Sequence, residues 1–272
     1  MHIPSWLAAE KFWVDAGIAL IVLAAVAALV SYRIPAARRL ALAGALPLAI
    51  VMLLAGLALR WQQSGQGPFL TLYEVLISNV FTLGLFLLLA CALVPSARAA
   101  AQVALPVLAL FALWALSTSR DVTPLPPTFD NPWLWAHVLA GKLFLGACLV
   151  STALALRLCA TRTSAWIQDV QTRELDATVW RFAGLAFVFE SLMLVAGAAW
   201  ANDAWGRYWG WDPLETWAFL TWLSLGIVLH ARLAWRLPQR LAWAGMCVVF
   251  VFAVLTFFGV PFFSVAPHKG VI

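Results

Sequence analysis

Charged residues are scarce in this sequence. Asp, Glu, Lys and Arg together make up 11% of its 272 residues, whereas 64% are hydrophobic. A soluble domain with so few charges could not cover its surface with polar groups, and this balance is typical of a polytopic membrane protein. The net charge of +5 does not indicate nucleic-acid binding. Most of it comes from Arg residues between apolar runs, where membrane topology accounts for them.

Closely spaced cysteine pairs are absent as well. The sequence contains no CxxC and no CxxCH pattern, and its four cysteines lie in or at the ends of apolar segments: Cys91, Cys148, Cys159 and Cys247. We interpret them as small apolar residues rather than as disulfide partners or thiolate ligands. The chain therefore has no c-type haem attachment site of its own.

Eight apolar stretches are each long enough to cross the hydrocarbon core of a bilayer as a helix. Their expected limits are 12–32, 40–60, 69–94, 100–118, 134–158, 180–201, 213–233 and 240–262. Each must be helical, because lipid offers no hydrogen-bond partner to the backbone. Lys11 and Asp15 interrupt the opening, so we expect no cleavable signal peptide. We predict an all-α polytopic membrane protein that forms a single integral-membrane domain over residues 1–272.

Basic residues are divided unevenly between the two sides of these spans. With the N-terminus outside, the inner connections carry Arg33, Arg38, Arg39, Arg98, Arg157, Arg162, Arg173, Arg181, Arg232, Arg236 and Arg240. The outer side then carries Lys11, Arg60, Arg120, Arg207 and Lys269. The positive-inside rule therefore predicts extracytoplasmic termini in a multi-pass protein of the cell inner (cytoplasmic) membrane.

One short segment between the sixth and seventh spans concentrates aromatic residues. It reads WGRYWGWDPLE from Trp205 to Glu215 and holds three of the chain's 16 Trp within seven residues. Such a string is expected where a large, flat, apolar ligand lies on it. Asp212, Pro213 and Glu215 predict a helix start, with Asp212 as the N-cap, Pro213 as the first helical residue and Glu215 completing a capping box.

Three of the four histidines lie at the ends of predicted spans. His137 lies at the outer start of the fifth span, His268 just beyond the outer end of the eighth, and His230 near the inner end of the seventh. A single histidine at such a position is ordinarily an interfacial residue that has a hydrogen-bond partner. Two on the same side as the Trp segment favour axial ligation of haem iron by imidazoles from opposite faces. His2, near the terminus, is given no role.

The remaining polar residues leave several interpretations open. Arg207, inside the Trp segment, could pair with haem propionates or with Asp212, or stack on an indole ring. Four polar residues within or at the ends of spans are expected mainly to join neighbouring helices: Glu74, Asn79, Lys142 and Glu190.

The Trp segment resembles a known motif. Trp205-Gly206-x-x-Trp209-x-Trp211-Asp212-Pro213-x-Glu215 is similar to the WWD motif of haem-handling proteins in cytochrome c maturation. Four further stretches resemble the CcsA (ResC) family in particular: PFLTLYE at 68–74, TWAFLTWL at 216–223, LHAR at 229–232 and FFGV at 257–260. The resemblance runs from about residue 67 to the end of the chain.

This resemblance implies a subunit of a System II cytochrome c synthase, a lyase. Such a subunit moves haem b to the extracytoplasmic face and positions it for thioether attachment to a CxxCH apocytochrome c. The implied partners are a CcsB (ResB) protein and thiol-reducing thioredoxin-like proteins. His137 and His268 match the axial ligands of the outer haem, and His230 matches the ligand of an inner haem.

The resemblance also assigns four residues of the motif to haem binding: Trp205, Trp209, Trp211 and Asp212. Arg207 is added to them as a possible partner of a haem propionate. Asp212 is the only candidate for a direct catalytic role. Two alternatives remain. One is a haem translocator or chaperone-loading protein like CcmC, without attachment activity. The other is an assembly subunit that binds no haem and uses the Trp cluster for protein docking.

Overall fold

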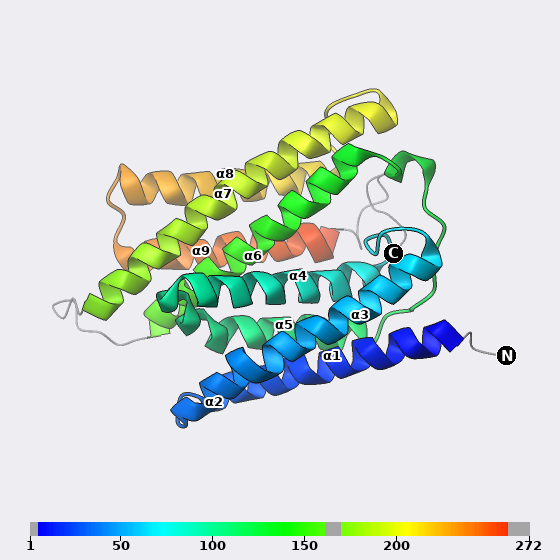
Figure 1. Cartoon of the computed structure of the whole chain (residues 1–272). Coiled ribbons are helices and arrows are strands. Elements are labelled where there is room, and N and C mark those ends of the chain that lie inside the picture. The colour runs from blue at the N-terminus through cyan, green and yellow to red at the C-terminus, as the bar shows by residue number, and fades with distance from the viewer. Residues whose placement is uncertain (1–4, 161–169, 261–272) are drawn as a thin grey trace. The chain divides into compact units, whose positions relative to one another are not determined.

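The computed structural model describes residues 5–160 and 170–260, and these residues form helices joined by short connections (Figure 1). The α-helices are α1 (Ser5–Val30), α2 (Pro35–Arg39), α3 (Leu46–Ser64), α4 (Leu72–Leu93), α5 (Ala101–Ala115), α6 (Pro132–Ala160), α7 (Val170–Trp205), α8 (Pro213–Leu233) and α9 (Gln239–Val254). Two π-helices, η1 (Leu40–Ala45) and η4 (Leu255–Gly259), and two 3-10 helices, η2 (Pro95–Ala100) and η3 (Pro127–Phe129), complete the described chain.

Eight helical stretches are long and apolar enough to cross a membrane in the part of the chain that the structure describes. This confirms the predicted all-α polytopic fold. The sixth span differs most from its expected limits, because α7 has 36 residues rather than the 22 of 180–201. At 1.5 Å per residue it is about 54 Å long, well beyond the thickness of a hydrocarbon core. Its first turns are polar, so they are suited to extend past the bilayer.

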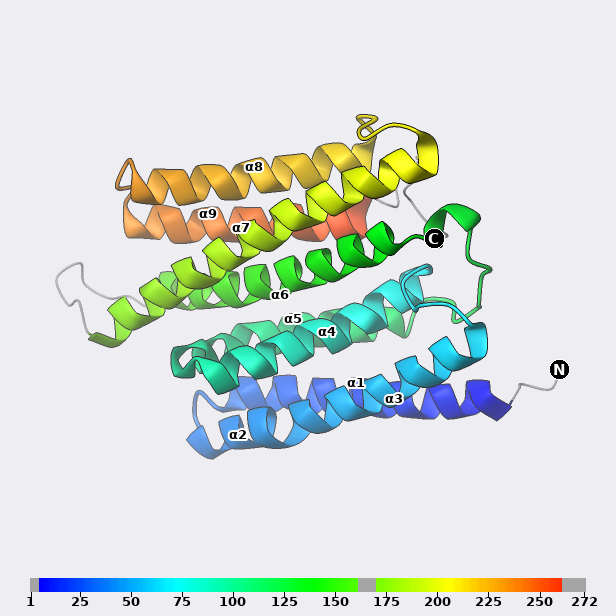
Figure 2. The same ribbon diagram turned by 45° about the horizontal axis from the view of Figure 1, so that its top comes forward.

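The described helices cluster into two compact units, one within residues 1–125 and the other within 126–270. The expectation of one integral-membrane domain remains a prediction. In the first unit, α1 packs along α3 and α5, and α4 contacts both α3 and α5 (Figure 2). Two glycines let α1 and α3 approach closely: a Cβ at Gly17 would lie 2.7 Å from Leu53 Cγ, and one at Gly56 would lie 2.5 Å from Val14 Cγ2.

A fully buried arginine joins the helices at one end of the first unit. Arg60, near the end of α3, is 0% exposed. Its Nε donates to Glu74 Oε1 at 2.7 Å, and its Nη1 lies 3.5 Å from Glu10 Oε2. Glu10 also accepts from the Tyr73 hydroxyl at 3.0 Å. Glu74 therefore joins helices as predicted, within an ion-pair network that connects α1, α3 and α4.

The same arginine fixes the segment that follows α5. Arg60 donates to the carbonyls of Arg120 and Asp121, each at 3.0 Å. Arg120 pairs with Asp15 at 2.5 Å and lies over the Tyr73 ring. The segment after α5 is thus held to three helices, α1, α3 and α4.

In the second unit, α6 packs along α7 and α9, and α8 contacts α7 and α9 (Figure 2). Hydroxyl groups link the helices: Ser151 donates to the Val179 carbonyl at 2.9 Å and Thr152 to the Met246 carbonyl at 3.1 Å. Glu190 does not join helices as predicted. It is 0% exposed, and neither carboxylate oxygen has a hydrogen-bond partner among the described residues. Such an apolar environment favours the neutral, protonated form of the Glu190 carboxyl group.

Candidate functional site at the Trp loop and His137

The Trp loop, which we define as residues 206–212, connects α7 to α8. Asp212 caps α8, since its Oδ1 accepts from the Glu215 amide at 2.9 Å. Glu215 Oε2 in turn accepts from the Asp212 amide at 3.3 Å and from the Gly210 amide at 2.7 Å. The predicted capping box is therefore confirmed. Its carboxylate does more than cap the helix, because it also holds the loop one residue before Trp211.

Trp211 has a backbone conformation that a bulky side chain rarely adopts. Its φ is 57°, in the left-handed region, and its side chain is 70% exposed. A non-glycine residue in this region costs on the order of 1–3 kcal/mol unless its surroundings hold it there. The two amides on either side of Trp211 both donate to Glu215. The loop thus holds Trp211 in an unfavourable backbone conformation in which its indole ring is exposed.

Trp209 lies behind the exposed ring. Its indole contacts Trp211 edge to face at 5.7 Å and Phe219 at 6.3 Å. Its Nε1 is buried and has no hydrogen-bond partner in the described structure. A buried indole N–H is ordinarily bonded, so this donor is suited to an acceptor supplied by a ligand, such as a carboxylate.

Arg207 folds back across the loop. A Cβ at Gly210 would lie 2.8 to 2.9 Å from three atoms of the Arg207 guanidinium, so a larger residue at 210 would displace the guanidinium from the loop. Within the described residues Arg207 makes no ion pair with Asp212 and lies over no aromatic ring. The pairing of Arg207 with a haem propionate stays a prediction.

His137, in the second turn of α6, lies directly against α7. Its Nδ1 donates to the Met193 carbonyl at 2.9 Å, because a carbonyl can only accept. The proton is thereby assigned to Nδ1, and Nε2 keeps the lone pair with which a neutral imidazole binds a metal. A backbone carbonyl behind a ligating imidazole is the usual arrangement at metal sites.

Gly197 makes this position possible. A Cβ at residue 197 would lie 2.7 Å from His137 Nδ1 and 3.0 Å from its Cε1. Buried Ala140, Met193 and Ala218 pack with Phe257, so that α6, α7, α8 and η4 meet at the residue whose carbonyl accepts from His137.

One buried tryptophan connects His137 to the motif. Trp200 is 2% exposed, and its Nε1 donates to the Thr128 carbonyl at 2.7 Å. Its ring centroid lies 6.1 Å from that of His137 and 5.0 Å from that of Trp205. The structure therefore brings the first Trp of the motif and His137 against the same indole. Neither Trp200 nor Gly197 was singled out from the sequence, although both follow Met193 at helical spacing.

His230 lies at the other end of α8, in its last turn. The imidazole is exposed and contacts Trp235 edge to face at 5.2 Å. Two residues on, Arg232 pairs with Asp176 at 3.2 Å, and that carboxylate also accepts from Trp180 and Trp243 at 3.0 and 2.7 Å. The end of α8 that bears His230 is thus bonded to α7 and α9.

His268 lies outside the described residues, as does His2. The pairing of His268 with His137 therefore stays a prediction. The described residues that do come together at the Trp-loop end fit a haem. They offer an imidazole of the right tautomer, a buried donor without an acceptor, an outward-facing indole, and a cation that forms no ion pair within the described ranges.

Replacing Gly197 by alanine is expected to displace His137 without unfolding α7. The added methyl group would overlap Nδ1, so the imidazole must rotate away from the Met193 carbonyl. We expect haem affinity at this site to fall by about tenfold, as when an outer-shell partner is lost. Gly184→Ala is the matched control, because a Cβ there meets nothing within 4 Å on the same helix. Titration with haemin measures both; equal affinities would contradict the role of Gly197.

Comparison with known proteins places this arrangement in a family. A family model described as Cytochrome C assembly protein matches residues 19–268. The chain is 32% identical over 209 residues to the cytochrome c biogenesis protein CcsA of Chlamydomonas reinhardtii, covering 71% of this chain and 59% of that one. It is 31% identical over 262 residues to CcsA of Prochlorococcus marinus (strain MIT 9303), covering 82% and 81%.

A solved structure has the same fold. Cytochrome c Heme Lyase CcmF superimposes with a TM-score of 0.71 over 95% of this chain and 48% of that chain, at 20% sequence identity. At this identity the likeness concerns the fold alone. The chain spans about half the length of CcmF and about three fifths of the Chlamydomonas relative. The match over residues 19–268, together with the CcsA relatives, shows that the chain belongs to the cytochrome c assembly protein family.

Proposed function

We propose that this protein is the haem delivery and presentation subunit of a cytochrome c synthase. It would move haem b to the extracytoplasmic face of the cytoplasmic membrane and position it for attachment to a CxxCH apocytochrome c. The observation that carries the proposal is His137, whose Nδ1 is bonded to the Met193 carbonyl while its ring shares Trp200 with the motif residue Trp205. The family and its CcsA relatives support the same role.

Each residue of the site has a proposed role in haem binding that is consistent with its surroundings. His137 would bind the iron through Nε2, with His268 as the opposite ligand. Trp209 would donate its buried N–H to a carboxylate oxygen, and Arg207 would pair with a propionate at the loop surface. Trp211 would lie against the porphyrin edge or the incoming peptide, which its exposure allows. Asp212 caps α8 and so keeps the loop in place.

Haem, as the substrate, supplies the vinyl groups to which the cysteine thiols of the acceptor add. The chain's own part is to bind and orient, which reduces the entropy cost of bringing thiol and vinyl together. Its described cysteines are buried or lie away from the Trp loop on the sequence, so the reduced thiols must come from the acceptor. We therefore propose thioredoxin-like reductants and a CcsB (ResB) protein as its partners.

The decisive experiment is coexpression with a CxxCH acceptor and a ResB-like partner, followed by mass spectrometry of the acceptor. Covalent addition of haem supports the synthase. Haem that copurifies with the chain but never becomes covalent would instead favour the translocator role, in the manner of CcmC. A purified chain with no Soret absorption under haem-replete conditions would overturn both and leave a docking subunit.

His230→Ala is expected to lower the amount of haem that copurifies with the chain by more than half. His230 is exposed at the end of α8 opposite the Trp loop, so it would hold haem before its transfer. Its second axial ligand would come from the partner protein. His2→Ala removes an imidazole with no assigned role and serves as the control. Full haem loading of the His230 variant, measured by pyridine haemochrome, would reject an inner entry site.

A further inference from the structure

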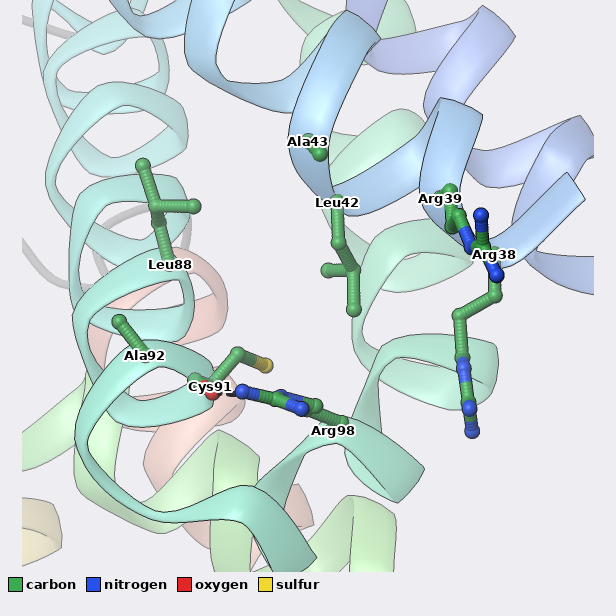
Figure 3. Close-up of a pocket in the computed structure, with 8 residues that line it drawn as sticks. All are labelled: Arg38, Arg39, Leu42, Ala43, Leu88, Cys91, Ala92 and Arg98. Atoms are coloured by element: carbon green, nitrogen blue, oxygen red, sulfur yellow. Dashed lines mark hydrogen bonds between the residues drawn. The ribbon is translucent and has the colours of Figure 1, made fainter. Parts of the chain in front are cut away.

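A hollow in the first unit combines three arginines with aliphatic walls. It has a volume of about 370 Å³ and opens between α2, η1, α4 and η2 (Figure 3). Arg38 and Arg39 lie at the end of α2, and Arg98 lies on η2. Leu42 on η1 and Leu88 on α4 form facing walls (Figure 3). None of the residues predicted to bind haem belongs to this unit.

The three cations have no counter-charge of their own. Within the described residues, all ion pairs of this unit involve Arg60 or Arg120, and no carboxylate lies within 4.0 Å of Arg38, Arg39 or Arg98. Arg98 is held in place nonetheless, because its Nε donates to the Cys91 carbonyl at 2.9 Å. Its remaining guanidinium nitrogens can bind an anion without the cost of first ordering the side chain.

The wall of the hollow is a widened helix. Residues Leu40–Ala45 form a π-helix that ends two residues before Pro47, which has no N–H to donate to the Ala43 carbonyl four residues earlier. The widened turn accommodates this lost bond and sets Leu42 and Ala43 at the hollow. Single-turn π segments within longer helices are frequent at functional sites.

We propose that this hollow binds an anionic phospholipid of the inner leaflet. The phosphate would be held by Arg38, Arg39 and Arg98, and an acyl chain would lie between Leu42 and Leu88. Two features select this ligand. Positive charge beside an aliphatic wall matches a molecule that is anionic at one end and apolar at the other. The inner connections, where the positive-inside rule places these arginines, face the leaflet that carries anionic lipids.

The test is lipid retention by the purified full-length protein. The protein is exchanged into mixed micelles that contain equal amounts of phosphatidylglycerol and phosphatidylcholine, and bound lipid is measured by native mass spectrometry. Phosphatidylglycerol is expected to be retained preferentially. Arg98→Gln should reduce this preference by about fivefold, the effect of one basic residue near an anionic surface. The triple variant Arg38→Gln/Arg39→Gln/Arg98→Gln should abolish it.

Two further variants distinguish lipid binding in this hollow from a general effect of positive charge on the protein. Arg33→Gln/Arg236→Gln/Arg240→Gln removes three exposed arginines from the same predicted side and should leave the preference intact. Ala43→Trp keeps the charge but fills the hollow, and should lower retention of either lipid. Equal retention of the two lipids by the unmodified protein would overturn the proposal. So would displacement of the lipid by excess inorganic phosphate or by haemin, or an equal loss in both triple variants.

Discussion

His137→Ala is expected to abolish the low-spin haem absorption of the outer site while leaving the fold intact. The imidazole is held by the Met193 carbonyl and seated on Gly197, so its position is fixed before haem arrives. Removing it takes away one proposed axial ligand and leaves space beside α7. Trp200 keeps its own hydrogen bond to the Thr128 carbonyl, so the aromatic packing toward Trp205 should survive.

Added imidazole provides the control for this result. The substitution leaves space for a free imidazole, so imidazole at millimolar concentration should restore the low-spin spectrum. The His268→Ala protein should show the same loss of the low-spin spectrum and the same rescue by imidazole if both histidines bind one iron. A His137→Ala protein that keeps an unchanged spectrum without imidazole would contradict its assignment as a ligand. An altered spectrum with no rescue would indicate a structural role instead.

Arg60→Met is expected to destabilise the first unit by about 3–5 kcal/mol, the cost of removing one partner from a buried ion pair. Glu10 and Glu74 are each 0% exposed and would then share a buried site without a cation. The carbonyls of Arg120 and Asp121 would also lose their donor. The melting temperature of the detergent-purified protein should fall clearly, whichever ligand is present.

Two comparison variants test the cause of that loss. Asp15→Asn breaks an ion pair whose side chains are 19% and 37% exposed, and pairs of this kind contribute at most about 1 kcal/mol. The triple variant Glu10→Gln/Arg60→Met/Glu74→Gln removes the charges together and should recover most of the stability. A single Arg60→Met protein as stable as Asp15→Asn would show that the network is not what holds α1, α3 and α4 together.

Local rules account for the parts of the site that the sequence predicted correctly. The Asp212–Glu215 capping box forms because its donors and acceptors lie within four residues of one another. The eight spans follow from length and apolarity alone. The extent of α7 was underestimated, because hydropathy marks where a helix meets lipid and not where it ends. The prediction that both carboxylates join neighbouring helices was correct for Glu74 and wrong for Glu190. Burial alone does not show which partner a carboxylate contacts.

The sequence by itself determined the class of protein, the order of its helices and the residues of the Trp loop, because each follows from composition or from spacing along one stretch of chain. Only the tertiary structure decided that Gly197 seats His137, that Trp200 joins it to Trp205, and that three arginines surround an aliphatic hollow beside a π-helix. Those contacts join residues up to about sixty positions apart. They depend on how helices pack, which no local pattern encodes.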